Sequence, residues 1–514
     1  MSLSASVRHE GKSIGYIIGE YVGEHGKNLL LWFAFPTLVL VIAVFALVIA
    51  LVFTAYPQSA TASTIYIVLA LIFGVYLYQP DLPFLPGAAA FVATVFGGVW
   101  VGVTYPIALD PRGGRLWPVP RRDDRPAGRE PAVARPRERR HRALGPGDSP
   151  DGVVASVLPV WVLLQPRGFL TSSLLYVGGS GTLFTVVVGM SLGATETLQV
   201  SLPAYKGSFG DPDLATAPLS PDLFVTIACG STSGFHSLGS SGTTAKQPDQ
   251  ESDARTIGYG GMLAEGLLAT VVLTTVAVYA EVPAGSGIEL ALPNFGTGGG
   301  IILNAAFGVG EGIAAASMGL VLVSFLATSN DTAVRLGSDV LEEIVGTPET
   351  RTQEYAANRY VNSAVQVLPA YLLVASGSWA NLWPLFGGAN QTLAVLALLT
   401  ATLWLVNKDE RKRLVSTGGP MVAMLSVTIL ALLYLALYQN VYRKFLLGNW
   451  GDGSILISAV AGALQTAIAL VLVWLAVRIV ALGYENVREA PQDVAVADGG
   501  EASEEREKRE DRRE

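Results

Sequence analysis

Polar side chains recur inside segments of the sequence that are otherwise apolar. The stretch "ACGSTSGFHSLGSSGTT" (228–244) consists largely of glycine, serine and threonine, with one histidine, His236. Irregular backbone at membrane depth must be buried in protein or line a watery cavity, because an unpaired amide is costly there. The ends of a broken helix can hold an anionic substrate or a coupling ion. We therefore expect Ser233, His236 and Ser240 to contact a substrate; a re-entrant or extramembrane loop is the alternative.

One carboxyl group stands inside a long uncharged segment. Glu265 lies in "GGMLAEGLLATVV" (260–272), between Ala264 and Gly266. An ionisable side chain within a span costs about 2.5–3.5 kcal/mol on insertion scales, so it is a functional candidate by default. Desolvation would favour the protonated form and allow proton exchange during turnover. A carboxylate that caps a helix at the membrane surface is the alternative. His236 could exchange a proton or recognise an anion, although a lone histidine is more often a structural donor.

A second acid follows an apolar run in "ATSNDTAVRLG" (327–337). Arg335 follows Asp331 by one helical turn, so the two side chains can pair on one helix face. If that pair is buried, it would gate or couple transport; at the membrane surface it would be an ordinary helix-end ion pair. We favour the surface position for Arg335 and the buried one for Asn330, and Asp331 is a second candidate for proton coupling.

Two carboxamides lie in the middle of a late apolar stretch, "LFGGANQ" (385–391). Gly387 and Gly388 are expected to loosen a helix there. Buried amides need hydrogen-bond partners, which a substrate carboxylate or peptide group can supply. Asn390 and Gln391 are therefore candidate substrate-binding residues, and helix-to-helix hydrogen bonding is the alternative.

The elements that must position these side chains are membrane-spanning helices. Of the 514 residues, 51% are hydrophobic and only 15% are charged, which is more apolar surface than a soluble chain can bury. A spanning helix needs about 20 apolar residues, and the chain has room for about eleven spans. The sequence predicts an all-α polytopic bundle with broken helices. The main apolar runs are 29–53, 61–78, 87–109, 171–192, 258–280, 313–328, 361–376, 393–406, 421–438 and 455–482.

The expected organisation has five parts. A cytoplasmic segment (1–28) precedes helices at 29–110, an interval at 111–151 follows, and a transporter core (152–482) leads to a disordered charged cytoplasmic tail (483–514). Basic residues near the first span and in "NKDERKR" (407–413) place both on the cytoplasmic side. No cleavable signal peptide is visible. The single cysteine, Cys229, excludes an internal disulfide and a cysteine metal cluster, and no metal or cofactor is expected.

The interval 111–151 differs from the rest of the chain. It holds eleven arginines and eight prolines in 41 residues. One interpretation is a disordered basic loop for anionic lipid or nucleic acid. The composition favours a second one, translation of a GC-rich gene in a wrong reading frame. On that interpretation an external loop and part of a helix are replaced, and no nucleic-acid partner is expected.

Several long motifs resemble the carbon starvation protein (CstA) family. They are "SVRHEGKSIGYIIGEYVG" (6–23), "SVLPVWVLLQPRGFLTSSLLY" (156–176), "FHSLGSSGTTAKQ" (235–247), "DARTIGYGGMLAEGLLA" (253–269), "VSFLATSNDTAVRLG" (323–337) and "WPLFGGANQTLAVLAL" (383–398). The resemblance implies a cytoplasmic-membrane importer of peptides or pyruvate, made in carbon starvation, proton-coupled and related to the inverted-repeat amino acid–polyamine–cation transporters. Family members usually begin with additional spans, so the chain is expected to be N-terminally truncated.

Other classes of protein fit the sequence less well. His-Glu-x-x-His does not occur, and the one Gly-x-Ser-x-Gly match, "GMSLG" (189–193), ends an apolar span without the context of a nucleophile elbow, so no enzyme is expected. A channel would need rings of repeated charges or carbonyl groups, and a sensor would need a soluble output domain. A sodium-coupled carrier of amino acids or small organic anions is the serious alternative to proton symport. The expected partners are a small-molecule substrate, a coupling proton or sodium ion, and membrane lipid.

Overall fold

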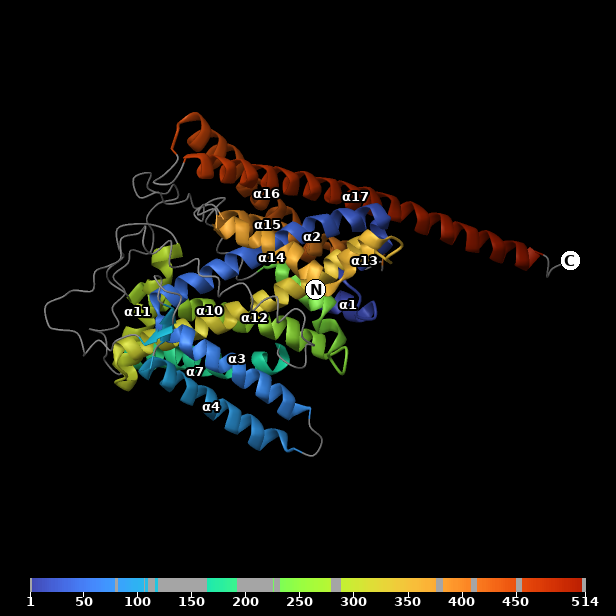
Figure 1. Cartoon of the computed structure of the whole chain (residues 1–514). Coiled ribbons are helices and arrows are strands. Elements are labelled where there is room, and N and C mark those ends of the chain that lie inside the picture. The colour runs from blue at the N-terminus through green and yellow to red at the C-terminus, as the bar shows by residue number, and fades with distance from the viewer. Residues whose placement is uncertain are drawn as a thin grey trace.

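The computed structural model describes residues 2–78, 82–105, 107–109, 116–118, 164–191, 225, 232–278, 288–375, 382–407, 414–449 and 455–510. These residues form a bundle of helices with one short pair of strands (Figure 1). The helices are α1 (Ser2–Arg8), α2 (Ile14–Ala55), α3 (Pro57–Leu77), α4 (Phe84–Thr104), α7 (Leu164–Ser191), α9 (Gly234–Gly242), η4 (Thr244–Lys246), α10 (Asp253–Val278), α11 (Ile288–Phe307), α12 (Glu311–Val345), α13 (Arg351–Ala357), α14 (Arg359–Ala375), α15 (Leu382–Asn407), α16 (Leu414–Leu433), the π-helix η7 (Tyr434–Leu446) and α17 (Ile455–Glu510).

The helical membrane architecture is confirmed. Within the described ranges, nine helices are long and apolar enough to cross a membrane. The sequence predicts about eleven spans, but that count also includes residues that lie outside the described ranges. The inverted-repeat relation that the resemblance implies stays a prediction.

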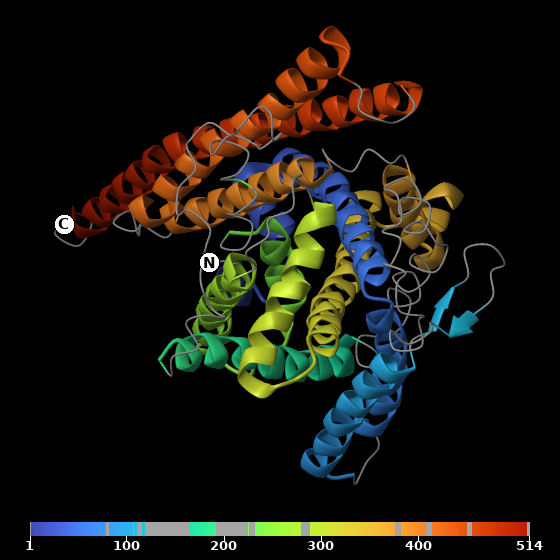
Figure 2. The same cartoon turned by 90° about the vertical axis from the view of Figure 1, so that its left-hand side faces the viewer.

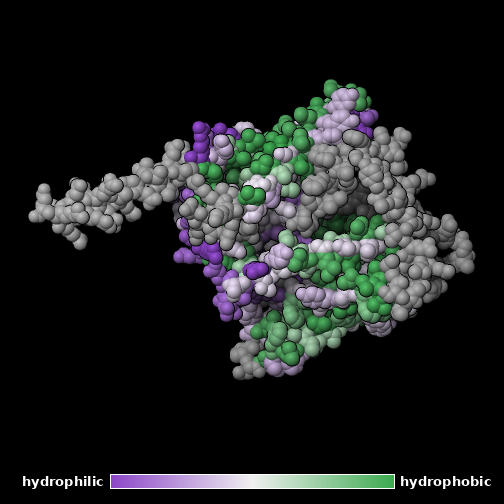
Figure 3. Space-filling model, turned by 180° about the vertical axis from the view of Figure 1, so that it is seen from behind, coloured by the Kyte–Doolittle hydropathy of each residue, from purple (hydrophilic) through white to green (hydrophobic). Residues whose placement is uncertain are grey.

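The centre of the bundle is built by α2, α12 and α15. In α15, 94% of the most apolar window is buried, against 17% in α10 and 22% in α4. Large apolar side chains of the outer helices therefore face outward, and Figure 3 shows them as broad hydrophobic areas on one face. A bilayer removes this area from water, because hydrocarbon solvates apolar side chains as well as a protein core does.

A second, smaller core lies beside the central one. It joins α3, α4 and α7 through Tyr66, Phe73 and Leu170, and includes Leu320 of α12. Figure 2 shows the hairpin of α3 and α4 extending away from the rest of the bundle. Residues of α12 from Val323 onward belong to the large central core. Helix α12 therefore contributes to both cores and connects them.

The two segments that were predicted to be broken differ from each other. Helix α9 has only nine residues, beginning at Gly234. Helix α15, by contrast, runs without interruption through Gly387 and Gly388, so the expected loosening there is wrong. The physical reason is close packing: a Cβ at Gly388 would lie 2.6 Å from Cδ2 of Leu432 on α16. The backbone breaks instead inside α2, at Gly23, where φ is +83°.

Two expected boundaries also change. Helix α17 continues to Glu510, so residues 483–510 are helical rather than disordered and project from the bundle in Figure 1. Glutamate, arginine, lysine and alanine favour helix intrinsically, even without packing. Within the interval 111–151, Leu116–Pro118 (β2) pairs antiparallel with Ile107–Leu109 (β1). Residues 119–151 of that interval, and Cys229, lie outside the described residues.

Candidate functional site

The start of α9 is held by a carboxamide from α15. The Oδ1 atom of Asn390 accepts a hydrogen bond from the backbone N–H of Phe235 at 2.8 Å, and its Nδ2 donates to Ser233 Oγ at 3.1 Å. Ser233 Oγ also accepts from the N–H of His236 at 3.4 Å, as an N-cap residue does. Two predicted site residues are therefore brought together, and they bond each other and the helix start.

Close packing explains why glycine precedes Phe235. A Cβ at Gly234 would lie 2.4 Å from the carbonyl oxygen of Asn390 and 2.7 Å from the backbone nitrogen of Ala394. Only a residue without a side chain lets α9 approach the backbone of α15 this closely. The other end of α9 is held by the N-terminal segment, where Ser6 Oγ donates to the carbonyl of Ser241 at 2.7 Å.

Gln391 differs from its neighbour Asn390. Its side chain is fully buried, and neither Oε1 nor Nε2 has a hydrogen-bond partner among the described residues. An orphaned buried amide costs about 1–3 kcal/mol, so a ligand or water that bonded it would recover that free energy. Ser240, also predicted to contact substrate, lies on α9 and donates its Oγ hydrogen to the carbonyl of Ser237 at 3.0 Å.

The predicted histidine and the first predicted acid meet. His236 Nε2 lies 3.9 Å from Glu265 Oε1, and the two side chains are 62% and 40% exposed. Glu265 stands midway along α10, as the sequence predicts. Protein therefore covers both side chains only in part, because α10 is an outer helix.

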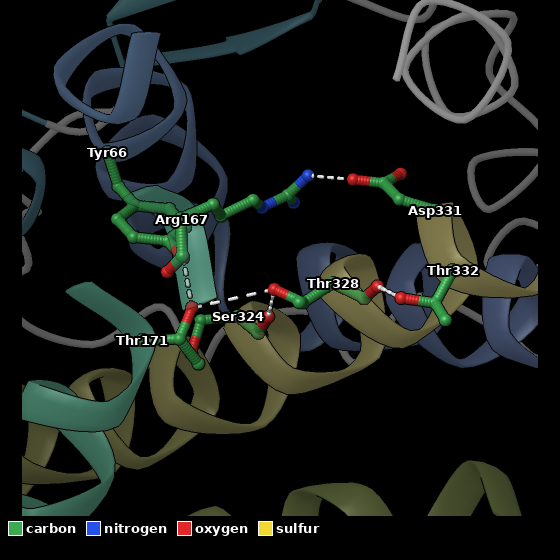
Figure 4. Close-up of polar contacts among 7 residues, drawn as sticks. All are labelled: Tyr66, Arg167, Thr171, Ser324, Thr328, Asp331 and Thr332. Carbon is green, nitrogen blue, oxygen red and sulfur yellow. Dashed lines mark hydrogen bonds and ion pairs between the residues drawn. The ribbon is translucent and has the colours of Figure 1, made fainter. Parts of the chain in front are cut away.

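The second predicted acid has a different partner from the one expected. Asp331 Oδ2 forms an ion pair with Arg167 Nη1 of α7, and each side chain is only 1% exposed (Figure 4). The pairing of Asp331 with Arg335 is therefore wrong. Residues four apart on a helix can pair, but the carboxylate of Asp331 binds the guanidinium of Arg167 on the adjacent helix α7 instead. Asn330 is buried as expected, 6% exposed, with Oδ1 lacking a partner among the described residues.

Hydroxyl groups of three helices lie beside Arg167. Tyr66 of α3 donates its hydroxyl to the backbone carbonyl of Arg167 at 2.8 Å and contacts the hydroxyl of Thr171. Thr171 Oγ1 lies 3.5 Å from Thr328 Oγ1 of α12; Figure 4 marks this contact with a dashed line. The guanidinium carbon of Arg167 is 5.8 Å from the centre of the Tyr66 ring, within cation–π range. Three helices thus contribute polar atoms to one buried cluster.

Arg167 is not among the site residues predicted from the sequence, although the sequence carries a signal for it. It is the sole charged residue between Asp151 and Glu196. The expected span began at residue 171 and left Arg167 outside, whereas α7 begins at Leu164. A charge inside a span is a functional candidate by default, so a correct helix start would have identified it. Within the described residues, no group of three or more histidine, cysteine, aspartate or glutamate side chains is arranged to hold a metal ion.

A bundle of long apolar helices with polar residues at its centre is a multi-pass membrane protein. The model of the family "Carbon starvation protein CstA" matches residues 1–112, 151–286 and 287–431, which is more than half of the chain. The chain therefore belongs to the carbon starvation protein CstA family, as its motifs predicted, and is a multi-pass protein of the cytoplasmic membrane. The matched ranges leave out 113–150, almost the whole arginine-rich interval.

Curated relatives are transporters by name. The chain is 28% identical over 516 residues to the pyruvate/proton symporter BtsT of Escherichia coli (strain K12), covering 84% of this chain and 67% of that protein. It is 28% identical over 480 residues to the peptide transporter CstA of the same strain, covering 80% and 63%. With the peptide transporter CstA of Mycobacterium tuberculosis (strain ATCC 25618 / H37Rv) it shares 30% identity over 342 residues, 54% of this chain and 44% of that one. The chain thus spans two thirds or less of these relatives.

The buried ion pair predicts a stability difference between two variants. Asp331→Ala leaves the Arg167 charge buried without this carboxylate, and breaking such a pair from one side costs about 3–5 kcal/mol. The double variant Arg167→Met/Asp331→Leu replaces both charges by apolar groups, so its unfolding temperature should be close to that of the parent. Thermal unfolding in detergent measures both. Equal unfolding temperatures for Asp331→Ala and the parent would contradict burial of the pair.

Proposed function

We propose that the chain is a secondary active transporter that imports a small substrate with a carboxylate, either a short peptide or pyruvate, during carbon starvation. Membership of the carbon starvation protein CstA family carries this proposal, because the relatives are named a pyruvate/proton symporter and peptide transporters. A polar cluster inside an apolar bundle supports it. We also propose that the helices follow the inverted-repeat arrangement of the amino acid–polyamine–cation transporters, for which the short capped helix α9 is the structural support.

The proposed substrate site lies where α9 meets α15. Ser233, His236 and Ser240 belong to α9 or its cap, and Asn390 and Gln391 belong to α15. The Ser233 hydroxyl and the Asn390 carboxamide already bond each other, so the role of these two residues is to fix the start of α9. The buried amide of Gln391 has donors and an acceptor available for a substrate carboxylate or peptide group.

Two acids have different parts in the proposed coupling. Glu265 lies 3.9 Å from His236, which suits exchange of a proton between the two side chains. Asp331 is buried, which suits holding a proton while the substrate is enclosed. We propose the proton rather than sodium as the coupling ion, because a relative of this chain is named a proton symporter.

Uptake into vesicles tests the proposed function. The chain, reconstituted in liposomes, should accumulate labelled pyruvate or dialanine under an inward proton gradient, and a protonophore should abolish the accumulation. An inward sodium gradient at equal pH should drive none. Accumulation with sodium alone would establish the sodium-coupled alternative. Accumulation of neither compound under either gradient would show that the proposed function is wrong.

Replacing Gln391 separates binding from packing. Gln391→Leu removes an amide without partners, so stability should rise by about 1–3 kcal/mol. The substrate loses one or two hydrogen bonds, and the KM for uptake should rise by about tenfold. The control is Thr392→Val, a buried neighbour whose hydroxyl bonds the carbonyl of Gly388 at 2.7 Å. A parent-like KM in Gln391→Leu would remove Gln391 from the site.

Replacing Glu265 tests this proton exchange. Glu265→Gln keeps hydrogen bonding but cannot titrate. We expect the initial rate of proton-driven uptake to fall by about tenfold or more, because positioned acids and bases contribute factors of this size to proton transfer. Exchange of labelled for unlabelled substrate at equal pH should be unchanged, since no net proton movement is required. If the rate of proton-driven uptake matches that of the parent, Glu265 is a structural residue.

A further inference from the structure

The ion pair between Arg167 and Asp331 joins two helices that belong to different parts of the bundle. Arg167 lies on α7 in the smaller core, and Asp331 lies on α12, which contributes to both cores. Both side chains are almost completely enclosed. Figure 4 shows the guanidinium extending from α7 to the carboxylate, with the hydroxyls of Thr171 and Thr328 beneath it. Any relative movement of α7 and α12 must therefore act on this contact.

Stability alone does not account for such a pair. The desolvation of two buried charges offsets much of their attraction, and well-packed apolar residues often serve as well or better. A planar guanidinium binds any carboxylate through parallel N–H···O bonds, whether it belongs to an aspartate or to a small molecule. Pyruvate and the C-terminus of a peptide present that same group. Asp331 thus occupies a position on Arg167 that a substrate carboxylate matches chemically.

We propose that Arg167 exchanges partners during transport: it binds the carboxylate of the substrate in place of Asp331, and Asp331 then carries the transported proton. The inference rests on the proposed function and specifies its substrate class and its proton carrier. A carboxylate that loses its cation in a dry interior binds a proton instead of remaining charged. One carboxylate therefore enters together with one proton, without any further coupling device.

The charges balance at each step. Before binding, the guanidinium is cationic and Asp331 is anionic. After binding, the guanidinium is still cationic, the substrate carboxylate is anionic and Asp331 is a neutral acid. Transport of pyruvate with one proton then moves no net charge, whereas a zwitterionic dipeptide with one proton moves one positive charge.

The surroundings of Asp331 are compatible with this exchange. Among the described residues, the titratable groups on the elements packed around it are Arg167 of α7, which pairs with it, and Tyr66 of α3, which contacts Arg167; Arg335 and Asp339 follow on α12 itself. The neighbouring Asn330 has a buried oxygen that lacks a partner among the described residues. That oxygen can accept a hydrogen bond from a substrate amide or ammonium group.

Helix α12 also connects the ion pair to the proposed site on α9. Leu336 lies five residues after Asp331 and faces α9. A Cβ atom added to Gly239 of α9 would lie 3.8 Å from Cδ1 of Leu336, and one added to Gly242 would lie 3.7 Å from its Cδ2. Five residues correspond to a rise of about 8 Å along a helix. A shift of α12 that follows exchange at Asp331 is thus transmitted directly to the packing of α9.

Proton uptake on binding is the decisive measurement. Titration calorimetry of the purified chain with pyruvate and with dialanine, in buffers of different ionisation enthalpy, reports the protons taken up per bound ligand. The parent should take up about one proton per carboxylate, and since one proton per ligand changes affinity tenfold per pH unit, it should bind about 100-fold more tightly at pH 6 than at pH 8. Dialanine amide, which has no carboxylate, should not bind.

Variants assign these effects to residues. Asp331→Asn keeps a hydrogen-bond acceptor for Arg167 and mimics the protonated acid, so it should bind equally at both pH values with no proton uptake. Arg167→Gln should lose binding of both carboxylates. The double variant Arg167→Gln/Asp331→Asn has neither charge and should fold, as judged by thermal unfolding, yet bind neither ligand. Arg335→Gln, which removes a cation one turn away, is the control that should behave like the parent.

Several results would overturn the inference. Parent-like binding by the double variant would make the pair a structural contact only. Proton uptake of one by Asp331→Asn would assign the proton to another group, with Glu265 and His236 next. Absence of binding of both carboxylates to the parent would exclude Arg167 as their site.

The vesicle experiment distinguishes this inference from the proposed function. If the chain binds a carboxylate together with a proton but accumulates nothing, the proposed symport is wrong and the proposed exchange at Arg167 is still supported. Accumulation that persists in Asp331→Asn to the final ratio of the parent supports transport and overturns the exchange. The expected result is that Asp331→Asn reaches no accumulation at any time, whereas Glu265→Gln reaches the parental ratio slowly.

Discussion

A helix that begins inside an apolar bundle depends on a partner for its first N–H groups, and the carboxamide of Asn390 provides one. The bond from the Phe235 N–H to Asn390 Oδ1 is 2.8 Å long and is shielded from lipid by α15. Without water, an unpaired amide would be costly enough to prevent α9 from beginning there. The close approach at Gly234 and the cap by Ser233 follow from this contact, because both require α9 to lie directly on α15.

The state of each buried polar group separates structural residues from available ones. Ser233 and Asn390 use their polar atoms on each other and on the start of α9. Gln391 and Asn330 are buried, yet carry polar atoms without partners among the described residues. Evolved interiors seldom leave such atoms unsatisfied unless water, an ion or a ligand completes them. The polar residues that matter for a substrate are therefore neighbours of the residues that hold the helices together.

The sequence predicted the class of fold and part of the site, for identifiable reasons. Long uncharged runs identify spans, and glycine with hydroxyl residues identified the short helix at Gly234. Pairs close in the chain were less reliable guides. Arg335 was chosen for Asp331 on helical spacing, but the partner is Arg167, 164 residues away. Hydropathy also placed the start of one span too late to include that arginine. Long-range contacts depend on how helices pack, which a single sequence without an alignment does not specify.

The location of the charges distinguishes the two acids more clearly than their sequence context does. Glu265 is on an outer helix and 40% exposed, so its carboxyl can change protonation without disturbing helix packing. Asp331 is 1% exposed and its ion pair connects the smaller core to α12, so its protonation necessarily weakens a contact between two parts of the bundle. A group whose charge state and helix contacts change together can link proton binding to movement. That linkage requires a buried acid with a cation on a different helix, which is the arrangement that α7 and α12 provide.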